Sequence, residues 1–129
     1  MKKIVYVILI LAVAIGLTVT LLDNRASRDT VLAKEIDSLF ENGETQIDLT
    51  ELTDFNWTQV AVFVPYTSDE AIEDAMGITF KGDNGGIDLL DDRFLLVFAD
   101  EKYAVKTVVL SLKHGTFSIK DNKTLIVEK

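Results

Sequence analysis

An uncharged apolar run near the N-terminus constrains this chain more than any other feature. Nineteen consecutive residues, Ile4 to Leu22, carry no charged side chain. A helix of that length would span ~28 Å, close to the hydrocarbon thickness of a bilayer. Lys2 and Lys3 precede the run, and positive flanks are retained on the cytoplasmic side. We therefore expect residues 1–3 to form a cytoplasmic tail and residues 4–22 a single transmembrane anchor, with the domain outside the cell membrane.

A cleaved signal peptide is the alternative interpretation of the same run. Ala12-Val13-Ala14 has the small-x-small pattern of a cleavage site. Cleavage there would leave only Ile4 to Leu11 as the apolar stretch and would expose the apolar residues 15–19 as a new terminus. The uncleaved anchor is therefore favoured, and secretion after cleavage remains the alternative.

The charge of the remaining chain limits the kinds of molecule that it is expected to bind. The 107 residues after the run suffice for one domain with its own core. They hold all 21 acidic residues and 11 of the 13 basic ones, a net charge of −10. An acidic surface opposes binding to nucleic acid, so we expect no nucleic-acid partner. The chain has no cysteine, which excludes disulfides, thiol catalysis and thiolate metal sites.

Two helices are predicted in residues 29–129, after a polar linker at residues 23–28. Apolar residues at helical spacing predict a helix over 30–42, capped by Thr30 or Asp29. Thr67 followed three residues later by Glu70 is a capping box, and it predicts a second helix that ends at residue 76.

Strand-like segments make up most of the other residues. They cover residues 45–49, 59–64, 78–80, 93–99, 103–112, 116–120 and 124–128. Short turns separate the last four, so these should form an antiparallel meander. The expected fold class is α+β: an N-terminal transmembrane helix, then a two-layer domain of two helices on one face of a five- to six-stranded, mainly antiparallel sheet.

Candidate chemistry is sparse, and we expect no catalytic, cofactor-binding or metal-binding residue. His114 is the only histidine and lies in a Lys-His-Gly turn, where nothing in the sequence places an acid behind the ring. We expect a solvent-exposed turn residue there. The acidic loop 83–92 offers many oxygen ligands, but it lacks the spacing of a calcium loop. A flexible acidic loop is the expectation, and calcium binding there stays open.

Two aromatic residues flank the strand predicted at 59–64. Trp57, the only tryptophan, precedes this strand, and Tyr66 follows it after the only proline, Pro65. Aromatic residues in such positions commonly plug the ends of a core. The alternative is that Trp57 and Tyr66 form a possible binding surface for a partner or ligand.

The same segment resembles a pattern in a group of small uncharacterised bacterial proteins, often exported or membrane-anchored. The pattern Trp-x-x-Val-x-Val-Phe-x-Pro-Tyr-Thr is formed here by residues 57–67. Those proteins often carry aspartate directly after the tryptophan, whereas Thr58 stands there in this chain. The resemblance covers about a tenth of the chain and implies a shared fold without implying an activity.

These observations predict a membrane-tethered extracytoplasmic binding or accessory module, not an enzyme. One alternative is an enzyme with a concealed acidic site near the loop 83–92. Another is a cell-envelope inhibitor or immunity protein whose acidic face meets a basic partner.

The anchor and its orientation can be tested by proteolysis. Protease added to intact cells should digest the domain and spare a membrane-embedded stub, because the positive flank holds the N-terminus inside. Immunoblotting of membranes before and after treatment measures this. Full protection of the domain, or mature protein in the medium, would contradict the prediction.

Overall fold

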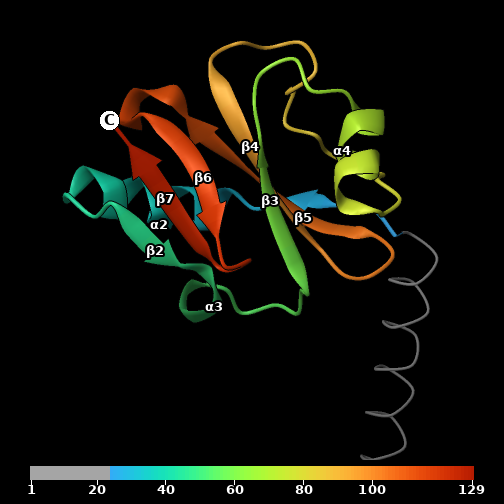
Figure 1. The fold of residues 1–129 in the computed structure, drawn as a ribbon, viewed down its shortest axis with the longest axis horizontal. Coiled ribbons are helices and arrows are strands. Elements are labelled where there is room, and N and C mark those ends of the chain that lie inside the picture. Colours follow the sequence, from blue (N-terminus) through green and yellow to red (C-terminus); the bar gives the residue numbers. More distant parts are fainter. Residues whose placement is uncertain (1–23) are drawn as a thin grey trace, which may run out of the picture.

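The computed structural model describes residues 24–129, which form two small sheets and three α-helices (Figure 1). Among these residues no helix is both long and apolar enough to cross a membrane. The anchor expected at residues 4–22 lies outside the described part of the chain. In chain order the elements are β1 (Ser27–Arg28), α2 (Thr30–Glu41), β2 (Gln46–Asp48), α3 (Leu49–Leu52), β3 (Gln59–Phe63), α4 (Asp69–Met76), β4 (Arg93–Ala99), β5 (Ala104–Ser111), the 3₁₀ turn η1 (Leu112–His114), β6 (Thr116–Lys120) and β7 (Thr124–Glu128).

The strands form two sheets rather than the single sheet expected. One sheet has the order β1-β5-β4-β3, antiparallel except for the parallel pair β1–β5, and the other has the antiparallel order β2-β7-β6. Asn122, in the β6–β7 turn, joins the two sheets. Its Oδ1 accepts from the Val60 amide (3.0 Å), and its Nδ2 donates to the Thr58 carbonyl (2.9 Å). One side chain of the three-stranded sheet thus satisfies backbone groups at the start of edge strand β3. The predicted meander changes sheet elsewhere, at η1 between β5 and β6.

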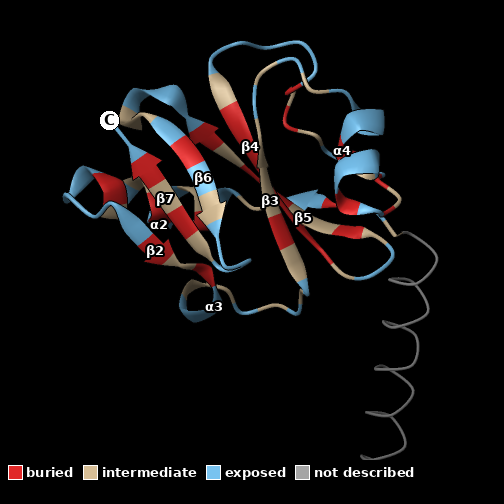
Figure 2. Cartoon of the chain, viewed as in Figure 1, coloured by how far each residue is buried: buried red, intermediate tan, exposed pale blue. Residues whose placement is uncertain are grey.

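Strand β4 explains why the helices do not share one face. Phe94, Leu96 and Phe98 point into a core formed with α2 and the three-stranded sheet. Leu95, Val97 and Ala99 belong to a second core under α4. Buried residues, red in Figure 2, lie on β4 and on the elements that cover it. A strand that is apolar on both faces must be covered twice, so α2 and α4 lie on opposite faces of the four-stranded sheet. The expected two-layer arrangement is therefore wrong in this respect, while the α+β class is confirmed.

The helix starts agree with the sequence only in part. Oδ1 of Asp29, one of the two expected caps, accepts from the Leu32 amide (2.9 Å). Helix α4 is capped by Ser68, whose Oγ accepts from the Ala71 amide (3.1 Å), and not by Thr67. The Thr67 hydroxyl, which the sequence predicts as the cap, instead donates to the Val64 carbonyl. It closes the turn before the helix and does not cap α4.

Three local elements differ from the sequence prediction. The segment predicted as a linker, residues 23–28, includes β1, which pairs in parallel with Lys106 and Thr107 of β5. The strand expected at 78–80 is reduced to one bridge between Thr79 and Tyr103. The short helix α3 was not predicted. The bounds of β4, β6 and β7 match the prediction.

The double core should fold without metal. Residues 24–129, prepared without the apolar run, should melt in one cooperative transition, because two apolar clusters cover both faces of β4. Excess chelator should leave the calorimetric midpoint unchanged. Loss of the cooperative transition in chelator would show that a metal ion holds the fold together.

Candidate functional site

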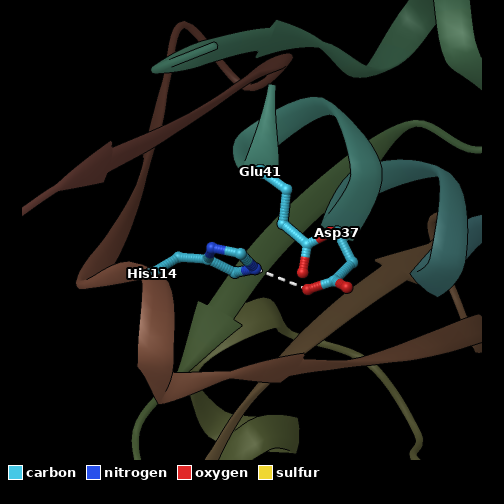
Figure 3. A group of neighbouring side chains, drawn as sticks. All are labelled: Asp37, Glu41 and His114. Carbon is cyan, nitrogen blue, oxygen red and sulfur yellow. Dashed lines mark hydrogen bonds and ion pairs between the residues drawn. The ribbon is translucent and has the colours of Figure 1, made fainter. Parts of the chain in front are cut away.

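The turn after β5 carries His114 inward rather than into solvent (Figure 3). Ser111 Oγ caps this turn, η1, by accepting from the Lys113 amide (3.3 Å). Gly115 follows with φ 127°, and a Cβ there would lie 2.2 Å from the Glu128 carbonyl oxygen. Only glycine allows η1 to pack this closely against the end of β7. This close packing orients the imidazole toward α2.

His114 therefore corrects the sequence prediction. Its side chain is only 9% exposed, and its Nε2 lies 2.5 Å from Oδ1 of Asp37 on α2. The ring also packs against Phe40, with centroids 5.7 Å apart. An acid does lie beside the ring, but it comes from a helix 77 residues earlier, a pairing that local sequence reasoning cannot see.

Lys113 and Glu41 complete a charged cluster around this pair. Lys113 Nζ lies 2.9 Å from Glu41 Oε1 and 3.5 Å from Asp37 Oδ1. The hydrogen bond from His114, aided by the Lys113 charge, lowers the pKa of Asp37. The hydrogen bond to Glu41 raises the pKa of Lys113. We call Asp37, Glu41, Lys113 and His114 the α2–η1 cluster.

A cleft of about 340 Å³ borders this cluster. Its walls come from α2, the start of β4, the end of β5 and η1, and they include Asp37, Arg93, Ser111 and His114. In a hydrolase triad the nucleophile contacts one imidazole nitrogen, Nε2, and the acid contacts the other. Here Asp37 takes Nε2, and Ser111 is engaged as the cap of η1. The arrangement does not match that chemistry.

The α2–η1 cluster also contains a set of potential metal ligands. The carboxylates of Asp37 and Glu41 and the imidazole of His114 offer ligand atoms that all lie within 4.8 Å of one another. Within residues 24–129, no other group of three or more histidine, aspartate or glutamate side chains brings its ligand atoms this close together. The i,i+4 spacing of the two acids, which places them on one helix face, was the one signal in the sequence.

The acidic loop 83–92 uses several of its oxygens within the fold. Asp83 Oδ1 accepts from the Gly85 amide (2.8 Å) and from the Arg28 guanidinium (2.9 Å). Asn84 Oδ1 accepts from Gly86, and Asn84 Nδ2 donates to Asp69. The expected flexible loop is thus a hydrogen-bonded one.

Trp57 packs as an aromatic plug of the core. Its ring meets Phe98 edge to face, with centroids 5.2 Å apart, and its Nε1 donates to Thr53 Oγ1 (2.9 Å). The residue is half-buried against the cluster that includes α2. Trp57 and Tyr66 lie at opposite ends of β3, so they do not form one surface.

Tyr66 does not plug the core; its side chain points into solvent. The residue is 65% exposed and adopts φ 67°, although it is neither glycine nor asparagine. Pro65 followed by a positive-φ residue is the pattern of a type II turn, where glycine or asparagine is favoured. The Tyr66 amide is held by the Ile87 carbonyl (2.6 Å). This backbone conformation costs about 1–2 kcal/mol for a side chain such as tyrosine.

Tyr66 is one of four exposed apolar residues on two adjacent loops. Val64 is 59% exposed, Leu89 78% and Leu90 41%. The hydrogen bond between Tyr66 and Ile87 brings the loop after β3 against the loop before β4. We call Val64, Tyr66, Leu89 and Leu90 the tip patch. Clustered exposed apolar residues of this kind commonly mark an interaction site.

Comparison with known proteins gives no relative. The chain matches no family model, no curated protein and no solved structure. The resemblance of residues 57–67 to the small bacterial proteins therefore stays a prediction, and the sites are interpreted from their own geometry.

Trp57→Ala should destabilise the domain. Because Trp57 is half-buried, we expect a loss of about 2–3 kcal/mol, below the ~3–5 kcal/mol typical of a fully buried tryptophan. Chemical unfolding measures this. The control Tyr66→Phe should change the unfolding free energy by less than ~0.5 kcal/mol, because the ring is exposed. Equal stability of Trp57→Ala and wild type would contradict the packing role.

Proposed function

We propose that the chain is a membrane-tethered extracytoplasmic binding module whose tip patch engages a basic, partly apolar segment of another envelope protein. The proposal rests on the exposure and the backbone conformation of Tyr66. A large aromatic side chain stands in solvent at a turn position where glycine would cost less. Backbone strain of this kind is found preferentially where a side chain has a functional role.

The charge around the tip patch supports a basic partner. Asp69 and Glu70 begin helix α4 shortly after Tyr66, and Asp88, Asp91 and Asp92 flank Leu89 and Leu90 in the loop before β4. All five acids are exposed, and Arg93 pairs with only one of them, Asp92. A negative rim around apolar residues attracts cationic segments and sets their orientation.

The position of the tip patch suits a tethered protein. In the register of the β3–β4 pair, Gln59 faces Ala99 at one end of the sheet and Phe63 faces Leu95 toward the other. Asn24, the first described residue, lies beside Thr58 and the β4–β5 turn, at the first end. The loops that carry the tip patch, after β3 and before β4, lie beyond the second end, at the top of Figure 1. A membrane anchor before Asn24 would leave the tip patch pointing away from the bilayer.

Membership of the group of small bacterial proteins with the Trp-to-Thr pattern is part of the proposal. The pattern has a physical basis in this chain. Trp57 plugs the core, Pro65 and Tyr66 form the turn, and Thr67 closes it with its hydroxyl. A pattern that specifies a strand and a strained turn would be kept by proteins that share this tip.

Two alternatives have different support. An inhibitor or immunity protein with a basic partner would use the same acidic tip patch and is a special case of the proposal. An enzyme with a concealed site at loop 83–92 has less support, because Asp83 and Asn84 use oxygens to hold the loop itself.

Site-specific photo-crosslinking in living cells tests the proposed function. A photoreactive amino acid at Leu89 should give a discrete adduct with an envelope protein. The same amino acid at Val31, which is also exposed but lies on α2, should give none. Immunoblotting detects the adducts.

Tyr66→Gly is the matched variant for this experiment. Glycine relieves the positive φ but adds freedom to the unfolded chain, so the unfolding free energy should stay within about 1 kcal/mol of wild type. The Leu89 adduct should fall severalfold, because the exposed ring is lost. An undiminished adduct in a folded Tyr66→Gly protein, or equal adducts from Leu89 and Val31, would refute the role of the tip patch.

A further inference from the structure

The α2–η1 cluster has the composition of a transition-metal site, and this feature is independent of the tip patch. Asp37 and Glu41 lie one turn apart on α2, so both carboxylates reach the same point in front of η1. His114 points its Nε2 at that point from the other side (Figure 3). The three side chains come from two elements that the core holds in place, through Phe40 on α2 and Phe117 after η1.

We propose that Asp37, Glu41 and His114 bind a divalent metal ion of the zinc class. One imidazole nitrogen and two carboxylate oxygens are ligands that Zn²⁺ accepts, and three protein ligands leave a fourth position open. Calcium and magnesium take mainly oxygen ligands, usually six or more, so an imidazole in a three-ligand set disfavours them. The cleft beside Asp37 and His114 gives the ion a route from solvent.

Lys113 supplies the second line of evidence, because its ammonium already occupies a cation position. Its Nζ contacts both carboxylates, at 2.9 Å from Glu41 and 3.5 Å from Asp37. The Lys113 side chain is 53% exposed and can move into water. The ammonium therefore neutralises the two acids without metal and competes with an incoming ion.

Metal binding requires only a small change at the site. Ligand atoms ~2.1 Å from a tetrahedral zinc lie ~3.4 Å from each other. The Nε2–Oδ1 separation of 2.5 Å must therefore widen by less than ~1 Å, and the hydrogen bond between them must be given up. Glu41 is exposed, so its side chain is free to rotate toward the ion.

Zinc titration of the complete 129-residue chain in a non-ionic detergent tests the site. After treatment with chelator and its removal, ZnCl₂ is added near neutral pH and the heat is measured by calorimetry. The wild type should bind one zinc ion saturably. Glu41→Gln and His114→Gln should each weaken binding by about 100-fold or more, because loss of even a supporting partner costs ~10–100-fold. Lys113→Met should tighten binding severalfold, by at most about fivefold for each of the two exposed ion pairs that it removes.

Matched variants separate the site from general charge effects. Glu35→Gln removes an exposed acid from the same helix, and Lys120→Met removes an exposed cation from β6. Both should bind zinc within about twofold of wild type. Co²⁺ provides a second readout, since its tetrahedral visible spectrum should appear in wild type and be absent in His114→Gln.

Thermal melts without metal verify that each variant is folded. Glu41→Gln keeps the test decisive if His114→Gln unfolds, because Glu41 is exposed and belongs to no core cluster. Saturable binding that depends on Glu41 and His114 and is tightened by Lys113→Met would support the site. Absence of binding by both wild type and Lys113→Met, or unchanged binding by Glu41→Gln, would overturn the proposal.

Discussion

Burial of β4 on both faces is the constraint on which the rest of the domain depends. From Phe94 to Ala99 every residue of this strand is buried. A strand of this kind cannot lie on the surface of a one-sided sheet, because half of its apolar side chains would face water. Helix α2 and the three-stranded sheet cover one face, and α4 with the loop before β4 covers the other.

This double covering also positions both candidate sites. Helix α2 is held by Leu32, Ile36 and Phe40, and the flank of the helix beside Phe40 presents Asp37 and Glu41 toward η1. The loop before β4 is anchored by the fully buried Ile87, whose carbonyl holds the Tyr66 amide. Leu89 and Leu90 then project beyond that anchor. Both sites lie on rigid supports, although each is built from turns.

The two sites differ in the evidence that marks them as functional. At Tyr66 the evidence is an unfavourable backbone conformation combined with exposure of an aromatic ring. At His114 it is convergence: a nearly buried imidazole, two carboxylates and an ammonium meet at one place. The first arrangement suits a contact with another protein, and the second suits a small cation. They can therefore serve the protein independently.

Local sequence patterns by themselves determined most of the secondary structure and the fold class. The strands at 93–99, 116–120 and 124–128, the Asp29 cap and the end of α4 at Gly77 follow from apolar period, turn residues and capping chemistry within a few residues. The same reasoning identified Trp57 and Tyr66 as distinctive. It could not assign one to the core and the other to solvent.

Only the tertiary structure decided which distant segments meet. The contact between the two sheets includes Asn122 reaching β3, more than 60 residues earlier, and the environment of His114 depends on Asp37 from another element. Such pairings are set by how the covering layers pack over β4. No local period or spacing records them, because a side chain's neighbours across the core are fixed by packing and not by chain order.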